Sequence, residues 1–78
     1  MAASSLLPAS RTALAVIRKS GNVIVDAELP TGDLLVLASA AAQWGASMTV
    51  RNAHLCSEGT LEEIAAAGRG HVTFDLAE

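Results

Sequence analysis

The stretch Gly45–Leu55, GASMTVRNAHL, decides the fold because a similar stretch occurs once before it and once after it. Apolar and polar residues alternate in its MTVR segment, which is the period of a strand with one buried face. GNVIVDAEL begins at Gly21 and GRGHVTFDL begins at Gly68, so short strands recur at a spacing of about 24 to 25 residues. This near-constant spacing predicts a repeat architecture.

Helical segments alternate with the strands. The first is predicted from Pro8 to Ser20, with Gly21 ending it, and the second runs to Trp44, with Gly45 ending it. An alternative treats residues 12–18 as a strand that turns into the next one, giving ββαβαβ.

Capping residues mark where the later helices begin. Thr31 or Asp33 is expected to cap the second helix, because either side chain accepts a hydrogen bond from a free helix amide. Thr60-Leu-Glu-Glu63 has the spacing of a capping box at the start of the third helix. Gly68 and Gly70 are expected to end that helix.

Strands are predicted at residues 22–28, 47–52 and 71–76, and strands separated by a helix must run parallel. The sequence therefore predicts an α/β fold of three helix–strand repeats, with a small parallel three-stranded sheet and the helices packed on one face, as in a solenoid. A doubly wound layer with helices on both faces is the structural rival. In the one-faced arrangement the buried positions stack as Val23–Met48–Val72 and Val25–Val50–Phe74, and the outward positions as Ile24–Thr49–Thr73 and Asp26–Arg51–Asp75.

The length, charge and hydropathy of the chain limit the classes of function that we expect for it. The 78 residues make one domain, 1–78, with residues 1–7 expected to be disordered. The net charge is −3 and the five basic residues are scattered, so we expect no nucleic-acid partner. The longest apolar stretch, residues 34–42, is about half of the ~20 residues that a membrane-spanning helix needs. A lone Cys56 and the lack of a signal-peptide pattern suggest a soluble, cytoplasmic protein.

At this point the chain resembles the leucine-rich-repeat class of strand–helix solenoids over residues 8–76. MTVRNAHL places Met48, Val50 and Leu55 at the spacing of the family's apolar positions, whereas Ala53 stands where the family usually has Asn or Cys. The first and third repeats match only through their strands. The resemblance implies protein binding on the exposed face of the sheet.

Residues that could carry chemistry are few. His54, Cys56 and Glu58 alternate after the second strand, where a metal site or an activated thiol is conceivable, but a metal site needs three or four ligands. We expect His54 and His71 on the surface and Cys56 as a small apolar residue in the turn. The sequence shows no activated nucleophile, metal cluster or cofactor cradle, so we expect no enzyme and no cofactor. We expect Arg51 to neutralise the carboxylates on the outward sheet face.

Neither end repeat carries an evident polar cap, and each terminal strand is expected to leave an open edge. Like edges would pair into a closed dimer, whereas head-to-tail stacking would give a filament. We therefore hypothesise a non-enzymatic protein-interaction module that works as a homo-oligomer and binds another protein. Its contact surface is expected to be the sheet face of Ile24, Asp26, Thr49, Arg51, Thr73 and Asp75.

Three further interface candidates are Trp44, Val72 and Phe74, of which Trp44 could instead pack in the core. The alternative function is a small ligand- or metal-binding domain that uses the loop around His54, Cys56 and Glu58. A fragment of a larger repeat protein is a third possibility, although Met1 suggests a complete open reading frame.

Overall fold

Helices and strands alternate along residues 6–77, which are the residues that the computed structural model describes. Their order confirms the three helix–strand repeats, with one short 3-10 helix, η1, inserted after the second strand. The elements are α1 (Pro8–Ile17), β1 (Val23–Asp26), α2 (Thr31–Trp44), β2 (Met48–Arg51), η1 (Ala53–Leu55), α3 (Glu58–Gly68) and β3 (Val72–Phe74). The alternative strand at residues 12–18 is wrong, because this segment lies mostly in α1.

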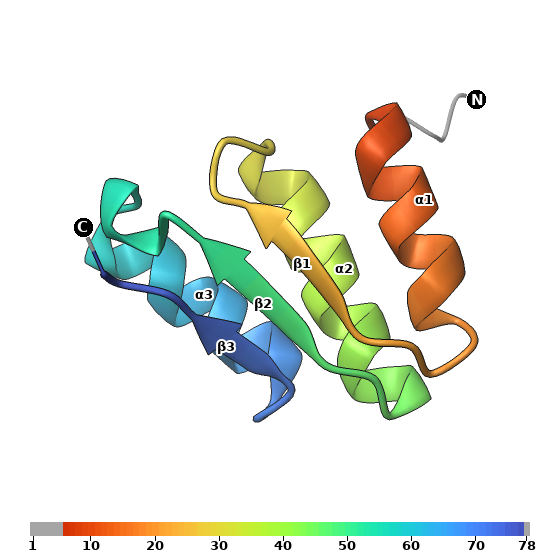
Figure 1. Ribbon diagram of the computed structural model, residues 1–78. Helices are drawn as coiled ribbons and strands as arrows, with labels where there is room; N and C mark the ends of the chain where they lie inside the picture. Colours follow the sequence, from red (N-terminus) through yellow and green to blue (C-terminus); the bar gives the residue numbers. More distant parts are fainter. Residues whose placement is uncertain (1–5, 78) are drawn as a thin grey trace.

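The three strands form one parallel sheet in the order β1-β2-β3 (Figure 1). Its register is the predicted one: Val23 pairs with Met48 and Met48 with Val72, while Val50 lies between Val25 and Phe74. Each strand is shorter than predicted by at least one residue at either end. Ladder-type hydrogen bonds nevertheless extend past the strands, since the Ala53 amide donates to the Asp75 carbonyl oxygen.

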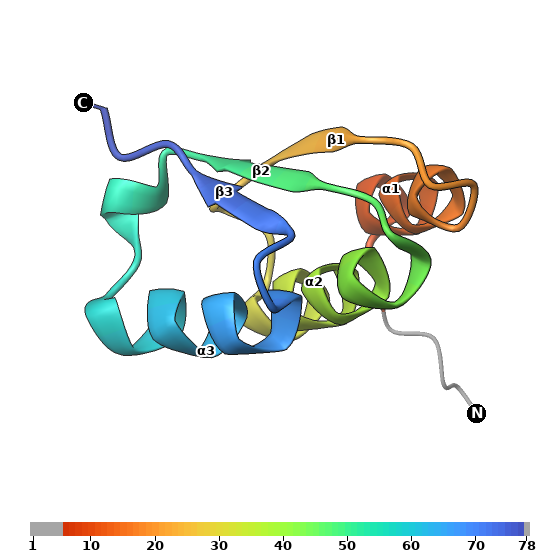
Figure 2. The ribbon, with the colours of Figure 1, turned by 90° about the horizontal axis from the view of Figure 1, so that it is seen from below.

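All three helices lie on the same side of the sheet, so the molecule has two layers (Figure 2). This confirms the one-faced arrangement and excludes the doubly wound rival. In the same view α1 lies closer to the plane of the sheet than α2 and α3 do, and it lies beside β1. The core fills the space between the layers, and its fully buried large apolar side chains are Ile17, Leu34, Leu37, Met48, Val50 and Ile64.

Small residues let the layers approach closely. Ala38 and Ala41 of α2 are fully buried, and Gly68 at the end of α3 lies against both α2 and β3. A methyl group added at Gly68 would overlap the Val72 side chain and lie 3.6 Å from the Cβ of Ala38. Gly21 has a local role instead: its added Cβ would lie 2.6 Å from Cγ1 of Val16 in the preceding helix, so glycine permits the tight turn after α1.

Two helix ends differ from the prediction. The first helix ends at Ile17, and residues 18–20 form a turn in which Ser20 has a φ of 63°. Its hydroxyl donates a hydrogen bond to the Trp44 carbonyl oxygen, at 2.8 Å, which helps to hold this turn. The third helix is followed by Arg69 in the left-handed region, rather than being stopped by glycine alone.

The predicted capping box is also wrong. The helix begins at Glu58, and Ser57 is the N-cap residue, whose hydroxyl oxygen accepts from the Thr60 amide at 3.2 Å. Thr60 therefore lies inside the first turn, and its own hydroxyl is hydrogen-bonded to Ser57 Oγ at 3.0 Å. Serine is as good an N-cap as threonine, so the capping chemistry is the expected one, three residues earlier.

Asp33 does not cap α2 either, because Pro30 is the N-cap residue and no side chain caps the helix. The Asp33 carboxylate is buried and turned towards α1, where its Oδ2 accepts from the Ser10 hydroxyl at 2.8 Å and from the Leu7 amide at 3.1 Å. Burial of a charge is tolerated when hydrogen bonds satisfy it. Asp33 thus links the first two helices. Leu7 belongs to segment 1–7, which was expected to be disordered, yet it makes this contact. Residues 1–5 of that segment lie outside the described residues.

We predict that Ser10→Ala destabilises the protein by about 1 to 3 kcal/mol, because it leaves a buried carboxylate with one hydrogen bond fewer. Thr12→Ala is the matched control: Thr12 is exposed on the same helix and alanine has the higher helix propensity. Urea unfolding of both variants measures the difference. Equal unfolding midpoints for the two variants would show that the Ser10–Asp33 contact is not stabilising.

We predict opposite effects for two glycines of α3. Gly68→Ala should destabilise by about 1 to 3 kcal/mol, since the methyl group overlaps Val72. Gly59→Ala should stabilise by roughly 0.5 to 1 kcal/mol, because nothing lies within 4 Å of its added Cβ and alanine favours the helix. Thermal unfolding followed by circular dichroism gives both signs, and a stabilising Gly68→Ala would contradict the close packing.

Candidate functional site

The face of the sheet opposite the helices carries the predicted binding residues (Figure 2). Ile24, Thr49 and Thr73 are paired across the three strands, and no element of residues 6–77 covers them. Ile24 is 67% exposed, Thr73 is exposed and Thr49 on the central strand is half-buried. The structure therefore brings these three residues into one accessible row.

A second row contains the charged residues. Asp26 pairs with Arg51 in the register, and Asp75 follows β3 at the corresponding position. Each aspartate accepts a hydrogen bond from the backbone amide two residues later: Asp26 Oδ1 from Glu28 at 2.8 Å, and Asp75 Oδ1 from Ala77 at 3.1 Å. The first and third strands thus end in the same kind of turn, with the exposed Arg51 between them.

Asp26 is held ionised chiefly by hydrogen bonds. The Glu28 amide is the largest cause that lowers the pKa of Asp26, and the Asn52 side-chain amide, 2.9 Å from Asp26 Oδ2, is the next. Burial opposes them, and the charge of Arg51 is the smallest contribution. The expectation that Arg51 is the neutralising group is therefore corrected for Asp26.

Asn52 is a residue of this face that the sequence pattern did not single out. It lies directly after β2 with a φ of 60°, a left-handed conformation that asparagine adopts more readily than most residues. From there its side chain reaches across to Asp26 on the neighbouring strand. The sequence did offer a signal for this residue, namely an asparagine directly after an alternating strand. Asparagine is common in turns because it tolerates the left-handed conformation.

The two edges of the sheet differ. On the β1 side, α1 lies beside the outer edge (Figures 1 and 2). On the β3 side, no element of the described chain lies beyond the strand (Figure 1). Val72 and Phe74 are half-buried here and pack their side chains against the core from this outermost strand.

The loop around His54, Cys56 and Glu58 does not form a ligand cluster. His54 is exposed in η1, Cys56 is half-buried and Glu58 begins α3. Within residues 6–77, no three or more His, Cys, Asp or Glu side chains are grouped so that they could hold a metal ion. The loop instead exposes Leu55, which is 64% accessible.

His71 is half-buried, although it was expected on the solvated surface. Its Nδ1 lies 2.8 Å from the Ala46 carbonyl oxygen, and because a carbonyl only accepts, Nδ1 donates in this contact. His71 thus ties the start of β3 to the segment before β2. Asn22 makes the equivalent link between β1 and β2, because its Oδ1 accepts from the Ser47 amide at 3.1 Å.

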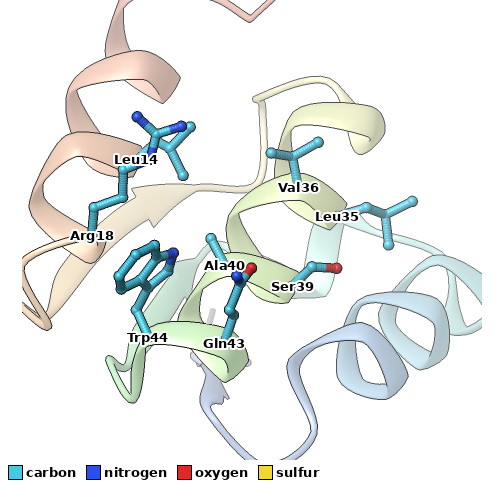
Figure 3. Close-up of a pocket in the computed structure, with 8 residues that line it drawn as sticks. All are labelled: Leu14, Arg18, Leu35, Val36, Ser39, Ala40, Gln43 and Trp44. Carbon is cyan, nitrogen blue, oxygen red and sulfur yellow. The ribbon is translucent and has the colours of Figure 1, made fainter.

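An open groove of about 420 Å³ lies between α1 and α2 (Figure 3). Trp44 lies at one end of it, near Leu14 of α1 and Arg18 of the following turn, while Val36 and Leu35 of α2 lie toward the other end. The indole is 44% exposed, so Trp44 is a surface residue and the interpretation as core packing is wrong. The groove is on the helical side, away from the sheet face.

No match to the chain was found among protein-family models, curated proteins or solved structures. The likeness to leucine-rich repeats therefore stays a resemblance of sequence pattern. None of the described helices has both the length and the apolar character needed to cross a membrane.

We predict that Asp26 makes stability depend on acid pH. A carboxyl whose pKa is lowered by folding contributes stability above its usual value of about 4, and this contribution is lost as the pH falls through the lowered value. Asp26→Asn should therefore destabilise the protein more at pH 7 than at pH 3. Thermal unfolding at both pH values tests this, with the exposed Glu62→Gln of α3 as control. An equal effect of Asp26→Asn at both pH values would contradict the assignment.

Proposed function

We propose that this chain is a non-enzymatic protein-interaction module that works as a homo-oligomer and uses the open sheet face as its contact surface. The observation that carries the proposal is the two-layer architecture, in which helices cover only one face of the sheet (Figure 2). Small domains bury a limited share of their surface alone, and association adds buried area. Another protein docking on the same face is the second partner that we propose.

The chemistry of the face supports contact with a folded surface. Ile24 offers an exposed apolar side chain at one end of the first row, and Thr49 and Thr73 continue the row with short side chains that permit close approach. Asp26, Arg51 and Asp75 add alternating charges, and alternating charges favour a partner of complementary pattern. Two copies related by a two-fold axis can place Arg51 of each opposite a carboxylate of the other.

The rival function, a small ligand- or metal-binding domain built on His54, Cys56 and Glu58, has no such support, because these residues do not converge on one site. Our proposal assigns no cofactor. It places the protein in the cytoplasm, on the ground that a lone cysteine suits a reducing compartment.

We predict that light scattering over a wide concentration range gives a mass above that of one 7.9 kDa chain. Ile24→Lys should reduce this mass, because it puts a charge at the most exposed apolar position of the face. Leu55→Lys is the matched control, since Leu55 is similarly exposed but lies in η1, off the sheet face. A monomeric wild-type chain at every concentration would refute the homo-oligomer, and a mass insensitive to Ile24→Lys would refute the face as its contact.

A further inference from the structure

The outer edge of β3 has free backbone hydrogen-bonding groups. The His71 carbonyl accepts from the Met48 amide, and the Asp75 amide donates to the Val50 carbonyl, so these two residues face β2. Alternate residues of a strand direct their backbone groups to opposite sides. The N–H and C=O groups of Val72 and Phe74 therefore point away from β2, to the side where no described element lies (Figure 1).

The β1 edge is not equivalent. An added strand lies about 5 Å from its neighbour in the plane of the sheet. Beside β1 that space is next to α1, which Figure 2 shows raised towards the sheet plane. A strand of a second copy would collide with α1 there, so head-to-tail pairing of β3 with β1 is blocked. Among residues 6–77 the β3 edge alone is open to another strand, and a second copy of the chain offers the same edge.

We propose that two copies pair β3 with β3, antiparallel about a two-fold axis at Thr73, and so form one continuous sheet with all helices on the same side. This inference rests on the proposed function, because it adds a specific self-contact to a self-associating module. It uses the strand edge, whereas the proposed contact surface is the sheet face. The pairing is closed, because the outer edge of each copy in the dimer is the β1 edge beside α1.

The register about Thr73 is self-complementary. On the side of the helices, Val72 lies opposite Phe74 of the partner copy. On the open side, Thr73 lies opposite Thr73 of the partner copy. Pairs of an aromatic and a β-branched side chain, and pairs of threonines, are among those that stabilise an antiparallel ladder.

This register also satisfies the free backbone groups. Residues that direct both groups outward form the hydrogen-bonded pairs of an antiparallel ladder, so Val72 and Phe74 of the two copies exchange both bonds. Thr73 then forms a non-hydrogen-bonded pair with its own copy, in which the Cα atoms are about 4.5 Å apart. That separation lies within the range of about 4.4 to 6.8 Å that a disulfide bridges.

Cysteine cross-linking tests the proposal in the full chain. In a Cys56→Ser background, which removes the native thiol, Thr73→Cys should form a covalent dimer as the main species under mild oxidation. Thr49→Cys is the matched control, because Thr49 has the same side chain and pairs with Thr73, but lies on the central strand. The β3 pairing keeps the two Thr49 positions apart, each one strand inward from the axis, so a disulfide through Thr49→Cys would come from contact between sheet faces and not from the edge. Circular dichroism confirms that both variants are folded.

The outcomes separate the edge from the face. A link through Thr73→Cys alone supports the β3 pairing, whatever the effect of Ile24→Lys on the mass. A link through Thr49→Cys alone indicates stacking of sheet faces, which overturns the β3 pairing and keeps the proposed function. No link in either variant, with an oligomeric wild type, also overturns the β3 pairing, and a monomeric wild type overturns both.

A charge at the axis gives a second readout. Thr73→Lys would place two ammonium groups opposite each other, which is destabilising for a directly opposed pair, and exposed lysine is compatible with an edge strand. If the β3 pairing is correct, the mass of this variant falls at least to half that of the wild type while its circular dichroism is unchanged. An unchanged mass overturns the pairing.

Discussion

The close approach of α2 to α3 and to the sheet is the contact on which the rest of the structure depends. Ala38 and Ala41 present only methyl groups from α2, and Gly68 presents none from α3, so the backbones can lie near one another. Larger side chains at these positions would push the helices apart and leave voids in the core. Dense packing of three helices on one side is what allows so small a chain to leave the other face of its sheet uncovered.

The open face is organised by its own strand ends. Asp26 and Asp75 each fold back on a following amide, and Asn52 uses a left-handed backbone to bridge from β2 to β1. These hydrogen bonds hold the two carboxylates in place next to their own strand ends. The side chain of Arg51 is exposed between them. The face therefore presents hydrogen-bonded carboxylates on either side of an exposed guanidinium.

The overall fold could be predicted because its signals are periodic. Alternation in MTVR and HVTF, with glycine before each strand, was enough to give the topology and the register. The helix starts were harder, because several serine, threonine and aspartate residues can each cap, and only packing selects one. Asp33 shows this most clearly: its partners Ser10 and Leu7 are remote in sequence, so its burial against α1 had no local signal.

The contact between Asp33 and α1 bears on how large the proposed assembly would grow. A subunit with one open strand edge stops at a pair, whereas a subunit with two open edges adds a further copy at each end. The hydrogen bond between Ser10 and Asp33, together with the buried Ala13 and Ile17, holds α1 beside β1, so under our proposal the β3 edge alone would take part. A chain whose α1 detached would have two open edges and would form longer assemblies.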